Sequence, residues 1–164
     1  MLYVFVEGPD DKAYFSKIFG AVWGDYTIIQ YASLKKDKIK GFIQSIGCIP
    51  NADYLFFGDA DGRGIGEAKA SLLSTFPYLV GEKIIIVQYE IESWYYAGAS
   101  EDVCKKLKIK HFVHNTDSIT KEQFESKLVR PAEKRYVMAC ILDQYLLALA
   151  TTRNTSLSVF ASSI

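Results

Sequence analysis

The stretch LYVFVEGPDDKAYF, Leu2 to Phe15, joins an apolar run typical of a β-strand to the start of a helix. Residues 2–6 are mostly β-branched, aromatic or aliphatic and favour a strand. Pro9 suits the first turn of a helix, because its missing N–H needs no partner there. The acids at 10 and 11 would meet the positive end of the helix dipole. The stretch therefore predicts a strand that turns directly into a helix.

The same alternation continues through the first half of the chain. Further strands are predicted at residues 26–32, 53–58 and 83–89, and helices at 35–46 and 64–76. The strands are continuous apolar runs, as expected where helices cover both faces of a sheet. We therefore expect an α/β fold with a doubly wound, mostly parallel four-stranded sheet.

The second half of the chain has shorter helical patterns and no further strand signal. Short helices are expected at residues 99–107 and 120–128, and one long helix over 130–150. Residues 154–164 are rich in serine and fit either a short helix or a frayed tail. We assign residues 1–97 to an α/β core and residues 98–164 to a helical extension packed on it.

Composition limits the class of protein. The 164 residues fit one domain with a small appendage, and 19 basic residues balance 19 acidic ones, so no global basic field points to nucleic acid. The three scattered cysteines predict reduced thiols in a cytoplasmic protein. No apolar run approaches the roughly 20 residues of a membrane span, and the N-terminus lacks the basic region of a signal peptide. We expect no membrane association.

Acidic residues follow three of the four predicted strands. Glu7 ends the first strand, Asp59 ends the third with Asp61 on the turn that follows, and the fourth ends near Glu90 and Glu92. Because ligands of open α/β sheets bind beyond the carboxyl ends of the strands, we expect these five side chains at one edge. Carboxylate oxygens suit Mg²⁺ or Mn²⁺, which also take phosphate oxygens of a substrate as ligands. The pattern predicts a divalent metal between the acids and a phosphate.

GDADGRGIG, residues 58–66, has several other interpretations. An EF-hand loop is excluded because Arg63 and Ala70 occupy its fifth and twelfth positions. The glycine spacing differs from that of a dinucleotide-binding loop. An aspartyl-phosphate phosphatase would use Asp-x-Asp-Gly after the first strand of its domain and would leave Glu7 unexplained. A solvated acidic turn is the remaining alternative.

Two motifs together resemble the TOPRIM domain of topoisomerases, bacterial-type primases, recombination proteins and related nucleases. VEGPDDKAYF, residues 6–15, is similar to its glutamate motif, and FFGDADG, residues 56–62, to its Asp-x-Asp motif. The resemblance covers about residues 1–97. The chain has no additional tyrosine-nucleophile domain and no zinc-binding domain, which argues against a topoisomerase and a replicative primase. QYEIESWYYAG, residues 88–98, resembles a segment of TOPRIM-like defence-associated proteins.

The resemblance implies roles for individual residues. Glu7 would act as general acid or base, Asp59 and Asp61 would bind Mg²⁺, and Gly8 would let the chain turn close to the substrate. Glu90 or Glu92 would complete a second metal site, unless one of them caps the helix that follows. It also implies a prokaryotic protein near mobile-element or defence genes.

Basic and small residues near the acids complete the candidate set. Arg63 could neutralise charge on a transferred phosphoryl group, and Gly62 would leave room for the substrate. Lys35 and Lys36 either contact a phosphate backbone or form a solvated helix face. A weaker basic candidate, near the C-terminus, is Arg153 with Asn154.

The expected function is a Mg²⁺-dependent phosphoryl-transfer enzyme acting on DNA or RNA, most simply a nuclease. The alternative is a non-catalytic TOPRIM-like interaction module, a partner or inhibitor subunit of a defence or toxin system. A protein partner encoded by a neighbouring gene and a homodimer are both compatible with the sequence. His111 and His114 lack a third ligand and are not assigned to a metal site.

Overall fold

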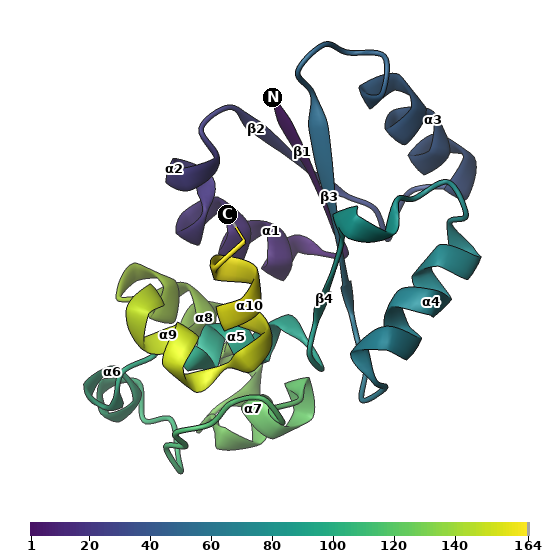
Figure 1. Ribbon diagram of the computed structural model, residues 1–164. Coiled ribbons are helices and arrows are strands. Elements are labelled where there is room, and N and C mark those ends of the chain that lie inside the picture. Colours follow the sequence, from purple (N-terminus) through teal and green to yellow (C-terminus); the bar gives the residue numbers. More distant parts are fainter. Residues whose placement is uncertain (164) are drawn as a thin grey trace. The chain divides into compact units, whose positions relative to one another are not determined.

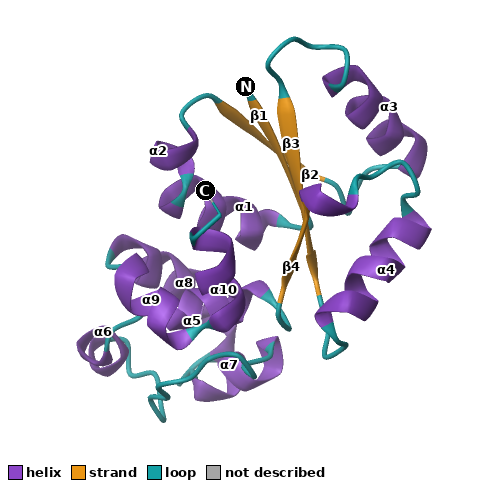
Figure 2. Ribbon diagram, viewed as in Figure 1, coloured by secondary structure: helices purple, strands orange, loops and turns teal. Residues whose placement is uncertain are grey.

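A computed structural model describes residues 1–163, which divide into two compact units at the junction of Val87 and Gln88 (Figure 1). The first unit contains all the strands and the second is helical (Figure 2). No helix within these residues is both long and apolar enough to cross a membrane.

The first unit alternates strands with helices, as the sequence predicts. Its elements are β1 (Leu2–Val6), α1 (Pro9–Ile18), α2 (Gly20–Trp23), β2 (Tyr26–Gln30), α3 (Lys36–Ile46), β3 (Asp53–Asp59), α4 (Ile65–Thr75), the 3-10 turn η1 (Gly81–Lys83) and β4 (Ile84–Val87). The predicted helix from Pro9 begins at that residue, with Asp10 and Asp11 in its first turn. The last strand is shorter than predicted because residues 88–90 leave the sheet.

The sheet has the order β2-β1-β3-β4, and every pairing is parallel. Val4 pairs with Ile28 on one side and with Leu55 on the other. Phe57 pairs with Ile85. The expected α/β class, with a doubly wound parallel four-stranded sheet, is therefore confirmed.

Both faces of the sheet are buried by aromatic and aliphatic side chains. On one face Phe5 and Phe56 stack with ring centroids 5.6 Å apart, and Ile39 and Ile43 of α3 pack in the same cluster. On the other face the Phe15 ring of α1 lies 4.1 Å from that of Phe57. Figure 1 shows α1 and α2 on one side of the sheet and α3 and α4 on the other. Each such fully buried ring contributes roughly 1.5–3 kcal/mol, which explains why the strands read as unbroken apolar runs.

The second unit is built around one buried helix. Its elements are α5 (Ile91–Ala97), α6 (Glu101–Lys106), α7 (Lys121–Lys127), the 3-10 turn η2 (Pro131–Glu133), α8 (Lys134–Asp143), α9 (Leu147–Arg153) and α10 (Thr155–Ala161). Every residue of α5 is buried, and the helix packs against α7, α8 and α9. The unit boundary therefore precedes α5, ten residues before the expected boundary at residue 97, because α5 buries its whole surface among the later helices.

The long helix expected over residues 130–150 is wrong: it is divided into α8 and α9. The Tyr145 hydroxyl donates to the Trp94 carbonyl at 2.8 Å, and the Leu146 N–H donates to the Gly98 carbonyl at 3.1 Å. A Cβ on Gly98 would lie 2.2 Å from the Tyr145 ring, so only glycine allows this approach. The N–H groups of residues 144 and 145 thus bond Ile141 and Leu142, three residues back, and the Leu146 N–H bonds the end of α5 in place of the Leu142 carbonyl.

The serine-rich end of the chain forms the short helix rather than a frayed tail over the residues described. Asn154 caps α10, because its side-chain oxygen accepts the Leu157 N–H at 3.0 Å. The Ser156 hydroxyl accepts the Trp94 indole N–H at 2.9 Å. Ser156 therefore satisfies a buried polar group of the second unit.

Candidate functional site

Four carboxylates gather at the carboxyl edge of the sheet in the first unit. Glu7 directly follows β1 and Asp59 is the last residue of β3, and these strands are paired and parallel. Asp11 lies in the first turn of α1, and Asp61 lies in the turn after β3. We call these four residues the acidic edge.

The turn after β3 holds Asp61 in an unusual backbone conformation. Asp61 has a φ of 49° and Gly62 a φ of 76°, so two successive residues are left-handed. The Ala60 N–H donates to Val87 at 3.0 Å, and the Arg63 N–H donates to Ala60 at 2.9 Å, which closes the turn. A left-handed backbone costs a residue other than glycine about 1 kcal/mol of folding free energy. The conformation of Asp61 in this turn therefore lowers the stability of the fold slightly.

Arg63 lies beside the acidic edge, next to Asp61. Its guanidinium donates to the Asp61 carboxylate at 3.1 Å, to the Ala60 carbonyl at 3.1 Å and to the Ser71 hydroxyl at 3.3 Å. The Arg63 and Asp61 side chains are 39% and 62% exposed, so water screens their ion pair. A phosphate oxygen could therefore replace the Asp61 carboxylate as the partner of Arg63 at a small cost in free energy.

The turn after β1 is fixed by Asp11 rather than by glycine itself. The Asp11 carboxylate accepts the Gly8 N–H at 2.9 Å, which stabilises the start of α1. Gly8 has an extended backbone, and a Cβ there would meet only Asp11 Oδ2, at 3.6 Å. The conformation therefore does not require glycine, and the predicted role of Gly8 beside a substrate stays a prediction.

Tyr31 lies beneath the acidic edge, and sequence reasoning missed it as a site residue. Its buried hydroxyl donates to the Phe57 carbonyl at 3.0 Å. Burial raises the pKa of Tyr31, and the negative charges of the four acidic-edge carboxylates raise it further. All four carboxylates therefore lie near enough to this phenol for their charges to act on it. Its position directly after β2, at the same end of the sheet as Glu7, could have indicated it.

Glu7 has an environment that favours its protonated form. Partial loss of hydration raises the pKa of Glu7, and the charge of Asp61 raises it further. Among the described residues no lysine or arginine forms an ion pair with Glu7. Two acids of the edge therefore repel each other, and a proton or a cation would relieve that repulsion.

The acidic edge is not a complete metal cage. In the part of the chain that the structure describes, no three His, Cys, Asp or Glu side chains are grouped so that they could hold a metal ion. Oxygen-only donors nevertheless suit Mg²⁺ or Mn²⁺, which bind through one or two carboxylates and keep water or phosphate ligands. The residues fit a metal that arrives with a substrate phosphate.

Glu90 and Glu92 lie in the second unit, where each has a protein partner. The Glu90 carboxylate accepts the backbone N–H of Lys121, the first residue of α7, so it caps that helix rather than its own. Glu92 is buried in an ion pair with Lys134, which also lies 3.4 Å from Glu125. Their predicted role as metal ligands stays a prediction.

Lys35 and Lys36, at the start of α3, are exposed. The Lys36 ammonium lies 5.9 Å from the centre of the Phe76 ring, and Lys38 lies equally far from Phe42. Both interpretations from the sequence, a phosphate contact and a solvated helix face, therefore stay open.

No protein-family model, curated protein or solved structure matches this chain.

Proposed function

We propose that the protein is a Mg²⁺-dependent phosphoryl-transfer enzyme acting on nucleic acid, and that its reaction is nuclease cleavage. The observation that carries the proposal is the placement of Glu7 and Asp59 at the carboxyl ends of two paired parallel strands, with Asp11 and Asp61 close by in the segments that follow. This edge is where open α/β folds bind ligands. The resemblance of residues 6–15 and 56–62 to the two TOPRIM motifs points to the same residues.

Asp59 and Asp61 would hold the metal, which would stabilise the charge that develops on the phosphate. Arg63 would add a second positive group, because its exposed contact with Asp61 can be exchanged for a phosphate oxygen. Glu7 would move the proton: its raised pKa lets it hold a proton more readily than an ordinary glutamate does. Tyr31, kept protonated, would position the edge without taking part in proton transfer.

The test is cleavage of plasmid DNA, single-stranded DNA and RNA with Mg²⁺ or Mn²⁺ by wild type, Asp59→Asn and Glu7→Gln. Asp53→Asn is the matched control, because Asp53 begins the strand that Asp59 ends and pairs with Lys83. We expect both edge variants to lose roughly 100-fold or more in rate, equivalent to about 3 kcal/mol, while the control keeps its activity. Circular dichroism checks the fold. Full activity in both edge variants would refute the assignment.

The second candidate is a non-catalytic interaction module, a partner or inhibitor subunit of a defence or toxin system. It is favoured by the lack of a three-ligand metal group among residues 1–163 and by the ion pair that already occupies Asp61. Such a module would bind Mg²⁺ and Mn²⁺ poorly and would cleave none of the three substrates. Saturable metal binding that depends on Asp59 and Asp61 would exclude it.

A further inference from the structure

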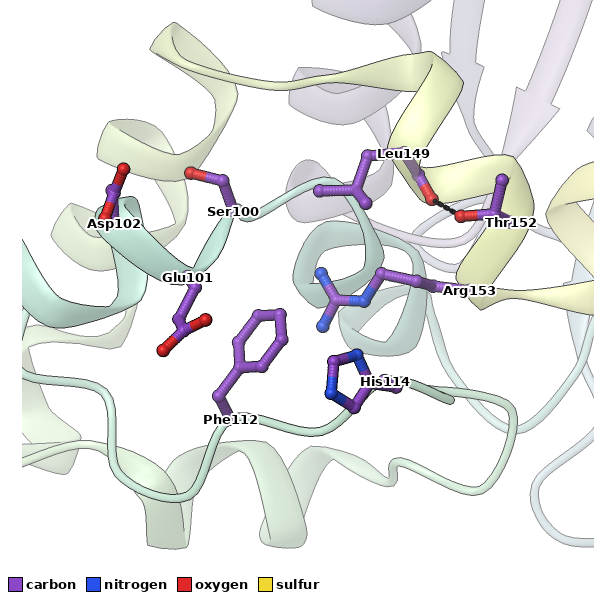
Figure 3. A pocket seen from close by; sticks show the side chains of 8 residues that line it. All are labelled: Ser100, Glu101, Asp102, Phe112, His114, Leu149, Thr152 and Arg153. Atoms are coloured by element: carbon purple, nitrogen blue, oxygen red, sulfur yellow. Dashed lines mark hydrogen bonds between the residues drawn. The ribbon is translucent and has the colours of Figure 1, made fainter.

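A pocket of about 590 Å³ lies within the second unit, between the start of α6, the segment around Phe112 and the last turn of α9 (Figure 3). Arg153 lines this pocket but is only 5% exposed. Its guanidinium donates to the carbonyls of Ala97 at 2.8 Å, Ala99 at 2.6 Å and Val113 at 2.6 Å. Arg153 therefore joins separate segments of the second unit, and its role is structural.

The first unit has a surface of a different kind, the outer edge of its sheet. β2 is the first strand in the order β2-β1-β3-β4, so β1 is its only neighbour in the sheet over the residues described. The Leu2 N–H donates to the Asp25 carbonyl at 2.9 Å, and the Tyr31 N–H donates to the Val6 carbonyl at 2.9 Å. The backbone groups of residues 25 and 31, at the two ends of β2, therefore face β1.

The backbone groups of Tyr26, Ile28 and Gln30 face the other way. Successive residues of a strand direct their N–H and C=O groups to opposite sides, so these alternate residues point away from β1. In the part of the chain that the structure describes, no loop, helix end or side chain bonds these outward groups. We call the three residues the β2 edge. An unpaired edge of this kind is a template for a further strand.

The β2 edge lacks the features that usually keep a strand edge from pairing. Those features are charged side chains, proline residues and bulges. Between Ile18 and Leu34 the only charged residue is Asp25, although 23% of the whole chain is charged, and this segment has no proline. β2 also pairs with β1 residue by residue, without a bulge. The sequence therefore leaves this edge open to association.

The pattern of the β2 edge fits a second copy of the same chain. A two-fold axis through Ile28, perpendicular to the sheet, would make two β2 strands antiparallel, and each edge residue could then both donate and accept a hydrogen bond. Ile28 would face its own copy and Tyr26 would face Gln30, so no like charges would meet. Val22, which is 60% exposed, adds apolar surface near the start of β2, where the rings of its neighbour Trp23 and of Tyr26 lie 5.7 Å apart.

We propose that two copies of this chain pair through their β2 edges and form one continuous sheet. Antiparallel pairing directs the carboxyl ends of the strands in the two copies in opposite directions. The two acidic edges therefore lie on opposite sides of the dimer, and each acts alone. The dimer is independent of the proposed nuclease activity.

Sedimentation equilibrium of the full chain, from about 1 to 100 µM, tests the proposal. Thr27→Lys adds to an exposed position of β2 the kind of charge that protects other strand edges. Gln30→Pro removes one outward N–H without adding a charge, and proline is tolerated there because this N–H does not bond β1. Thr75→Lys, at the exposed end of α4, is the matched control. Circular dichroism checks the fold of each variant.

We expect wild type and Thr75→Lys to form a dimer with the same dissociation constant, and Thr27→Lys and Gln30→Pro to raise that constant roughly tenfold or more. In wild type at about 100 µM the amides of Ile28 and Gln30 should exchange slowly with deuterium, and in Thr27→Lys the same amides should exchange fast.

Wild type that stays monomeric at about 100 µM would overturn the proposal. A dimer that persists unweakened in folded Thr27→Lys would also overturn it, as would a wild-type dimer in which the amides of Ile28 and Gln30 exchange fast.

Discussion

In the first unit Glu7 and Asp61 face each other across a solvent-exposed edge, whereas in the second unit Glu92 is buried against Lys134. Burial alone would lower the pKa of Lys134, but the hydrogen bond and charge of Glu92, with a smaller contribution from Glu125, raise it. Glu7 has no such cation among the described residues, and its own pKa is raised. A carboxylate thus stabilises the second unit through an ion pair, whereas two carboxylates destabilise the first unit through their repulsion. A carboxylate such as Glu7, which lies near another acid and forms no ion pair with a lysine or arginine among the described residues, is the one expected to serve a ligand.

The largest effect should follow from removing the buried carboxylate of the second unit. Glu92→Gln leaves the Lys134 ammonium, whose side chain is 12% exposed, with only the longer contact to Glu125. We expect a loss of about 3 kcal/mol in the free energy of unfolding, measured in urea. Glu133→Gln, which removes an exposed pair with Arg130, is the control and should cost less than about 1 kcal/mol. Equal costs for the two variants would contradict the assigned role of Glu92.

A second contrast concerns how tightly the two units pack around glycine. Gly98→Ala would place a Cβ 2.2 Å from the Tyr145 ring, whereas the surroundings of Gly66 in α4 are open within 4 Å. We expect Gly98→Ala to cost about 2 kcal/mol through overpacking. Gly66→Ala should instead stabilise the protein by about 0.5 kcal/mol, because alanine loses less entropy in a helix. Thermal unfolding of both variants measures the difference, and no loss for Gly98→Ala would show that the α8–α9 turn is not held by this contact.

These packing contacts also mark what the sequence could predict. The strands could be predicted because strands that are covered on both faces are continuous apolar runs. The shared location of the acids at one edge could be predicted because parallel strands end at the same edge of the sheet. The break between α8 and α9 could not be found locally, because Tyr145 turns away to bond Trp94, 51 residues earlier. The ion pair of Glu92 could not be predicted either, because its partner Lys134 is 42 residues away in the sequence. Arg153 appeared only as a weak basic candidate, since nothing nearby in sequence reveals its burial.

The smallest effect is expected at Glu7, where removal of the charge should stabilise the protein at neutral pH. The pKa of Glu7 is higher in the folded protein than in the unfolded chain, so the folded state binds this proton more tightly. The resulting stability is fully present below the unfolded-chain pKa and is lost as pH rises through the folded-state pKa. Glu7→Gln should therefore raise the melting temperature at neutral pH and lose this advantage by about pH 3.5. Glu82→Gln, at an exposed site, is the control, and a Glu7→Gln variant less stable than wild type at neutral pH would contradict the repulsion.

Metal binding tests the central claim most directly. Mn²⁺ would be titrated calorimetrically into wild type, the double variant Asp59→Asn/Asp61→Asn and the control Asp53→Asn, each with and without a cleavage-resistant phosphorothioate oligonucleotide. The account predicts saturable Mn²⁺ binding to wild type and the control, tighter with the oligonucleotide present, and its loss in the double variant. Identical behaviour of wild type and the double variant under both conditions would contradict the acidic edge as a metal site.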